Sequence, residues 1–120
     1  MDFEAAKDVC RSLPGCTEDT KWDNDTVFSV GARMFAATNK DVPARGFSFK
    51  VDDDRFLELT DRPGIDPAPY LARAKWVYVT PEARLDDDEL AALLRRSWEL
   101  VFGKLTRKLQ REIAGADAAA

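Results

Sequence analysis

The sequence predicts a single α+β domain, in which a mostly antiparallel sheet of about four strands carries helices on one face. Three segments place apolar residues at the spacing of an amphipathic helix, and four shorter segments are rich in β-branched and aromatic residues. The resulting order is α-β-β-β-α-β-α, and three successive strands joined by short connections favour antiparallel pairing. At 120 residues the chain can bury about two thirds of the surface that it exposes when unfolded, so one domain suffices.

The first half of the chain predicts one helix and three strands. The segment DFEAAKDVCRSL reads as a helix that Asp2 can cap and that Pro14-Gly15 ends. Residues 17–25 are polar and predict a loop. The segment TVFSVGARMFAATN predicts two strands of a hairpin that meet at Gly31-Ala32, and FSFKV alternates cleanly between apolar and polar side chains.

The second half predicts a short helix, a strand and a long helix. Asp52 or Asp53 can cap the segment DDDRFLELTD, whose acids suit the first turn of a helix. The segment RPGIDPAP predicts a loop, and KWVYVT predicts the last strand. DDDE at 86–89 opens the longest helix, whose apolar stripe is expected to run from Leu90 to Leu109.

These elements predict one domain over residues 1–113 and a frayed tail over 114–120, since AGADAAA lacks bulky apolar anchors. The N-terminal segment has acids where a signal peptide has basic residues, and no apolar run is long enough to span a membrane. We therefore expect a cytoplasmic protein, with a monomer favoured.

Composition limits the possible chemistry. The chain has no histidine, which excludes catalytic triads that need an imidazole and removes the commonest general base. Cys10 and Cys16 are expected to be reduced, partly buried thiols, and neither a metal nor a cofactor is expected. The net charge of −4 opposes binding to phosphates. Between residues 95 and 111, however, six basic side chains face one acidic one, a distribution that also suits a helix C-terminus.

One face of the sheet carries the candidate binding residues. If Phe47, Phe49, Val77 and Val79 point to the helices, then Lys50, Trp76 and Tyr78 point to the other face. Aromatic rings beside an ammonium group suit base stacking and phosphate contacts, and would serve equally as a hot spot for a protein partner. The remaining alternative is that the loop at 62–73 or the C-terminal tail covers this face, so that Trp76 is packed.

Five segments, taken in order, resemble the small bacterial MmcQ/YjbR-like proteins. They are RSLPGCTED, VFSVGARMFA, FSFK, YLARAKWVYV and RRSWELV. The resemblance covers about Phe3 to Leu105 and implies a fold like that of bacterial frataxin (CyaY-like), also described as a double wing. It also implies the family's label of DNA binding, which rests largely on fold analogy.

By this resemblance, Lys50 matches the family's lysine at the end of the third strand, and Trp76 matches its tryptophan at the start of the last strand. Ser97 and Trp98 match the family's serine and following aromatic residue in the last helix. Lys75 stands where the family usually has His, so a role that needs a neutral imidazole is in doubt whereas a cationic role survives. Ser97 is expected to bond to its own helix backbone and not to act as a nucleophile.

Two functions follow as hypotheses, and we expect neither to be catalytic. The first is DNA binding through the open sheet face, and the second is docking of a protein partner on the same Trp-bearing face. Frataxin-like iron binding by Asp2, Glu4 and Asp8 is a minor variant of the second, because three spaced carboxylates more often form a solvated face. An enzyme is disfavoured because the glycines are scattered singly and no acid/base pair is evident. The candidate binding residues are Lys50, Lys75, Trp76, Tyr78, Arg33, Arg45 and Arg73.

Overall fold

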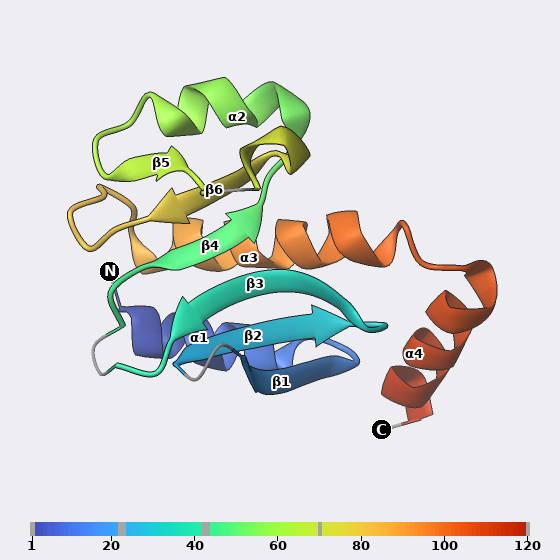
Figure 1. Cartoon of the computed structure of the whole chain (residues 1–120). Coiled ribbons are helices and arrows are strands. Elements are labelled where there is room, and N and C mark those ends of the chain that lie inside the picture. The colour runs from blue at the N-terminus through green and yellow to red at the C-terminus, as the bar shows by residue number, and fades with distance from the viewer. Residues whose placement is uncertain (1, 22–23, 42–43, 70, 120) are drawn as a thin grey trace.

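The computed structural model describes residues 2–21, 24–41, 44–69 and 71–119, with side chains described as far as residue 115 (Figure 1). Its helices are α1 (Phe3–Ser12), α2 (Asp53–Thr60), α3 (Asp87–Phe102) and α4 (Arg107–Ala119), and a short 3-10 helix, η1, spans Ala72–Ala74. Its strands are β1 (Cys16–Lys21), β2 (Asp25–Val30), β3 (Arg33–Asn39), β4 (Phe47–Lys50), β5 (Ile65–Pro67) and β6 (Trp76–Val79).

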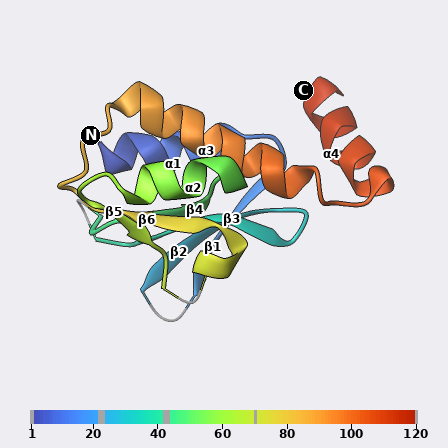
Figure 2. The same cartoon turned by 90° about the horizontal axis from the view of Figure 1, so that it is seen from above.

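All neighbouring strands pair antiparallel, in the order β1-β2-β3-β4-β6-β5. Helices α1, α2 and α3 lie together on one side of this sheet, whereas η1, the yellow turn below the sheet in Figure 2, lies on the other. The α+β class and the antiparallel sheet are therefore confirmed.

The sheet has six strands, so the prediction of about four was wrong. The two missed strands, β1 and β5, are the edges of the sheet. All of β1 after Cys16 is exposed, and β5 has three residues and ends in Pro67. An edge strand pairs on one side only and can be polar throughout, so neither segment shows the alternation that identifies a strand.

The helix caps explain where the helices begin. The Asp2 carboxylate accepts hydrogen bonds from the backbone of Glu4 and Ala5, as predicted. The Asp86 carboxylate accepts from the Glu89 N–H at the start of α3, also as predicted. Asp52 occupies the N-cap position of α2, but its side chain makes no capping bond.

The apolar stripe predicted to run unbroken to Leu109 is divided between two helices. Helix α3 ends at Phe102, with Gly103 as its C-cap, and α4 begins at Arg107 after a turn. Leu109 and Ile113 of α4 pack against the main core. A Cβ at Gly31 would meet Leu109, and one at Gly15 would meet Ile113, so α4 lies against two glycine-containing turns. Helix α4 thus turns back from the end of α3 and lies at the end of the sheet (Figure 1).

The main core lies between the sheet and the helices. Phe28, Phe35, Phe47 and Phe49 are completely buried there, and the Phe28 and Phe47 rings are stacked with centroids 6.4 Å apart. Together with α3, whose Leu94 is also completely buried, these rings fix the strands that carry the candidate site.

Helix α4 continues to Ala119, but Ala120 and the side chains of 116–119 lie outside the described part of the chain. The boundary at residue 113 therefore stays a prediction. Among the residues that the structure describes, no helix has the length and hydrophobicity needed to cross a membrane.

Candidate functional site

The structure confirms which side chains lie on the face away from α1, α2 and α3. Lys50 pairs with Trp76 across β4 and β6, and Ser48 pairs with Tyr78. The neighbouring residues Val77 and Val79 belong to the main core, and Trp76 does not. The period-two register predicted for these strands is therefore correct.

Trp76 is nevertheless buried, with 5% of its surface exposed. The backbone before β6 bonds to that of Trp76: the Trp76 N–H donates to the Leu71 carbonyl at 3.2 Å, and the Ala68 N–H donates to the Trp76 carbonyl at 3.0 Å. Ala68 is itself buried, and Tyr70 lies outside the described residues. Of the alternatives left open by the sequence, a packed Trp76 is the one observed.

The two candidate lysines are held by neighbouring groups. The Lys50 ammonium donates a hydrogen bond to the Ala74 carbonyl. Lys75 adopts the left-handed conformation, with φ 63°, and its ammonium lies 5.1 Å from the centre of the Phe56 ring. Its carbonyl accepts from the Val51 N–H at 2.8 Å. Lys75 thus joins the start of β6 to the end of β4, in a backbone conformation that is uncommon for a residue with a Cβ.

Lys50 lies in a positive environment. Burial lowers the pKa of its ammonium group, and the charges of Lys104 and Lys75 lower it further, although Asp53 acts in the opposite direction. Lys50, the last residue of β4, is therefore influenced by Lys75, which precedes β6, and by Lys104, which follows α3 and lines the same hollow as Lys50.

Two arginines lie at the same end of the sheet. Arg73 is in η1, two residues before Lys75. Arg33 begins β3 three residues before Ala36, which pairs with Phe49, so it lies level with the residues after Lys50. We call Lys50, Lys75, Lys104, Arg33 and Arg73 the basic end. Within the described part of the chain, none of the five forms an ion pair with an acidic side chain.

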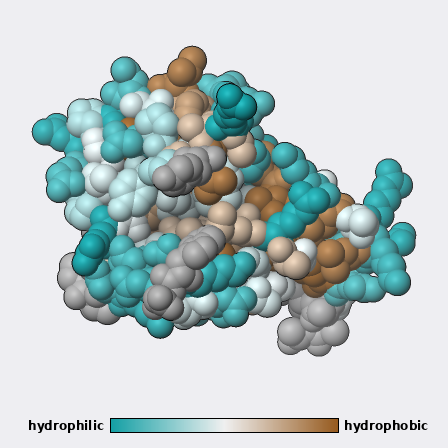
Figure 3. All heavy atoms as spheres, viewed as in Figure 1, coloured by the Kyte–Doolittle hydropathy of each residue, from teal (hydrophilic) through white to brown (hydrophobic). Residues whose placement is uncertain are grey.

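The other two candidates do not belong to the basic end. Arg45 lies beyond the opposite end of β3 and forms an ion pair with Asp41 at 2.6 Å. Tyr78 is half-buried, and its ring lies so close to Gly46 that a Cβ at that position would force the ring to move. Figure 3 shows this face, where hydrophilic residues line the left side and the lower edge and less polar residues continue from the centre toward α4.

Ser97 differs from its prediction. It is completely buried, and its hydroxyl donates to the Phe35 carbonyl at 2.7 Å and accepts from the Lys50 N–H at 3.0 Å. It therefore bonds to two strands and not to its own helix. The reason is that β3 and β4 pair at only two positions, so the backbone groups beyond them need another partner.

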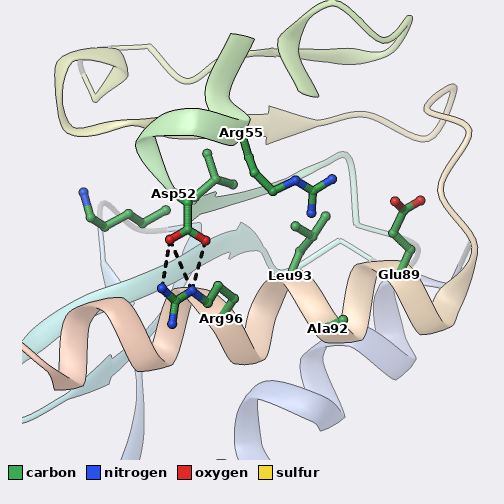
Figure 4. A pocket seen from close by; sticks show the side chains of 8 residues that line it. Asp52, Arg55, Glu89, Ala92, Leu93 and Arg96 are labelled. Carbon is green, nitrogen blue, oxygen red and sulfur yellow. Dashed lines mark hydrogen bonds and ion pairs between the residues drawn. The ribbon is translucent and has the colours of Figure 1, made fainter. Parts of the chain in front are cut away.

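A small hollow between α2 and α3 contains a charged network that the sequence did not reveal (Figure 4). It has a volume of about 100 Å³ and lies beside Lys50. Arg96 holds Asp52 by hydrogen bonds of 2.9 to 3.3 Å, which lower the pKa of that carboxyl group. Arg62 pairs with Glu89 at 3.0 Å in the same region. Because Asp52 and Arg96 lie 44 residues apart, no local pattern could have predicted their pairing.

The acids considered for iron have other partners. Asp2 caps α1, Glu4 lies 3.2 Å from the Lys7 ammonium and Asp8 lies 2.8 Å from Arg11. Among the described residues, no group of three or more Cys, Asp or Glu side chains could hold a metal ion.

The fold and the site define a small α+β protein with helices on one face of an antiparallel sheet and basic side chains at one of its ends. The chain belongs to the YjbR family, whose model, described as YjbR, matches residues 11–100. Comparison with curated proteins gave no match.

Solved structures that are similar to this chain include two that show how far the fold is shared. One is protein DR2400 of Deinococcus radiodurans, described by the family domain DUF419, which is 31% identical with a TM-score of 0.80 over 94% of this chain and 88% of its own. The other is a protein from Pseudomonas syringae, 19% identical with a TM-score of 0.68 over 84% of this chain and 99% of its own. At that identity the second similarity concerns the fold alone.

Proposed function

We propose that this protein is a non-catalytic nucleic-acid-binding protein that contacts the phosphate backbone through its basic end. The observation that carries the proposal is that Lys50 and Lys104 line one hollow and that Lys75 immediately precedes Trp76, which pairs with Lys50, on a chain with a net charge of −4. Repulsion from Lys104 and Lys75 is unfavourable for the Lys50 ammonium group, and Asp53 offsets it only in part. A phosphate placed among the three lysines would relieve this repulsion and raise the pKa of Lys50 toward its ordinary value.

The expected mode of contact is to the backbone and not to the bases. Stacking on Trp76 would require the loop at 68–74 to open, since this side chain is 5% exposed. Lysines act as point charges toward phosphate and carry no sequence information. We therefore expect binding that is non-specific in sequence and strongly dependent on salt.

The acidic remainder of the chain limits the affinity. Aspartates 52–54 lie next to the basic end, although Asp52 is neutralised by Arg96. A few phosphate contacts opposed by a negative net charge correspond to dissociation constants in the range of about 10⁻⁴ to 10⁻⁶ M near physiological salt.

The test is fluorescence anisotropy of labelled single- and double-stranded oligonucleotides at about 50 mM and about 200 mM salt. We expect binding that weakens as salt rises, and Lys104→Gln should reduce the slope of log affinity against log salt by about one. Lys104 is the best position because it is exposed. Lys40→Gln is the matched control, since Lys40 is an exposed lysine beyond the opposite end of β3.

Two results would refute the proposal. One is an unchanged anisotropy with both kinds of oligonucleotide at the lower salt concentration. The other is binding by the Lys50→Gln/Lys75→Gln/Lys104→Gln variant with the affinity and salt slope of the parent. Circular dichroism of each variant distinguishes lost binding from lost structure, because Lys50 also holds the Ala74 carbonyl.

Protein docking on an exposed Trp76 is the less favoured function, because a hot-spot side chain must be accessible to its partner. We also infer a frataxin-like arrangement, supported by an antiparallel sheet with three helices on one face. That resemblance bears on the fold, whereas the proposed function depends on the lysines.

A further inference from the structure

Helix α2 presents an exposed leucine between acids. Leu57 is 78% exposed, and among the residues that the structure describes it is the exposed large apolar side chain. Asp53 and Asp54 lie one turn before it and Asp61 one turn after it, which puts all three near the same face. None of these acids forms an ion pair with a described residue. We call Leu57 and these three aspartates the acidic knob.

A groove that combines apolar and basic residues, and so complements the acidic knob, lies between the end of α3 and α4. Its volume is about 360 Å³, and its lining is Phe102, Arg107, Gln110, Arg111 and Ala114. The lining side chains are apolar at Phe102 and Ala114, and the two arginines stand four residues apart on one side of α4. No ion pair joins either arginine to a side chain that the structure describes.

The groove is held open by its own contacts. The Phe102 ring stacks on Trp98, with centroids 4.6 Å apart, and the Trp98 indole donates to the Pro14 carbonyl at 3.0 Å. The Gln110 amide donates to the carbonyls of Phe102 and Leu105, at 3.1 and 3.0 Å. These bonds tie α4 to the end of α3, so a ligand would find the apolar surface already formed.

We propose that the acidic knob of one copy docks in the α3–α4 groove of a second copy. Leu57 would cover Phe102, and an aspartate one turn away from Leu57 would meet Arg107 and Arg111, which lie about one turn apart on α4. The occupant is a second copy because this chain carries both complementary surfaces. Helices α2 and α4 stand apart at different parts of the molecule in both views, so one copy cannot make this contact internally (Figures 1 and 2).

The proposed contact joins a knob to a groove. Two copies that exchange knobs about a twofold axis form a closed, isologous dimer, whereas a contact made only once between two copies is heterologous and extends to larger species. The groove uses none of the lysines of the proposed function, whereas Asp53 and Asp54 of the knob lie beside Lys50 and Lys104.

The test is sedimentation velocity of the full chain from about 5 µM to about 500 µM, a range that covers weak association. We expect the average mass to rise with concentration. Leu57→Ala should raise the dissociation constant by about 10- to 100-fold, the loss expected for exposing a leucine. Arg111→Glu should abolish association because it would repel the aspartates. The matched control is Lys108→Glu, which makes the same charge change on α4 outside the groove.

A mixing experiment tests the pairing itself. Leu57→Glu leaves an intact groove, and Arg111→Glu leaves an intact knob, so each variant alone should stay monomeric while an equimolar mixture associates. A parent whose mass does not change over the whole range overturns the proposal. So does association that survives both variants, or a mixture that behaves as the sum of its components.

Discussion

Replacing Ser97 by alanine tests how the sheet is held where β3 and β4 separate. The change removes a buried hydroxyl that bonds to the Phe35 carbonyl at 2.7 Å and to the Lys50 N–H at 3.0 Å. Each of those buried backbone groups then lacks a partner, at a cost of about 1 to 3 kcal/mol for each. Relaxation of the two strands should recover part of this, so we expect a loss of about 2 to 4 kcal/mol in the free energy of unfolding.

Urea denaturation followed by far-UV circular dichroism measures that loss, and thermal unfolding should show a midpoint lower by about 8 to 16 °C for a domain of this size. Ser12→Ala is the control, because the Ser12 hydroxyl also donates to a carbonyl, that of Val9, but is exposed. The control should change stability by about 0.5 kcal/mol or less. If Ser97→Ala costs no more than Ser12→Ala, the hydroxyl does not join the strands as described.

Three further predictions concern other parts of the molecule. Gly64→Ala should destabilise the fold by about 2 kcal/mol or more, as measured by thermal unfolding. The reason is that Gly64 has φ +85° and that a Cβ there would lie 2.5 Å from the backbone nitrogen of Ala83. An unchanged unfolding midpoint would contradict this. Burial raises the pKa of Cys16 to about 11, so at about pH 8 this residue should be thiolate roughly 100-fold less often than an ordinary thiol. Iodoacetamide should therefore modify Cys16 far more slowly in the folded protein than in the denatured chain. Equal rates would show that the thiol is not shielded. The hydrogen bonds from Arg96 lower the pKa of Asp52, so the stability they contribute is present above about pH 4 and is lost as the pH falls through the lowered value. The stability difference between the parent and Asp52→Asn should therefore shrink between about pH 5 and about pH 2, and a constant difference would contradict the pairing.

The sequence was most informative where a residue's role depends on near neighbours. Caps at Asp2 and Asp86 marked the starts of α1 and α3, and the period of two placed Phe49 and Val77 on the helix side of the sheet. The edge strands were missed because pairing on one side requires no apolar alternation. The break at Gly103 was missed because the apolar stripe continues on both sides of it.

For the candidate site, the face was predictable and the exposure was not. Alternation put Lys50 and Trp76 on the same face, which the strand register bears out. The burial of Trp76 is a tertiary property, which no local sequence pattern fixes. In the same way, Lys50 and Lys104 become neighbours because α3 packs across β4. The two lysines are far apart in sequence, so no local pattern could have predicted this.

The two edges of the sheet have a consequence for how this protein resists aggregation. A strand with a free edge can recruit a strand from another molecule and so begin fibril growth. Here one edge, β1, consists after Cys16 of threonines and the charged residues Glu18, Asp19 and Lys21. The other edge is β5, three residues long, where Pro67 has no N–H to offer. Neither edge is a suitable template for strand addition. Any fibril formation would therefore start from the unfolded or partly opened chain and not from the native sheet.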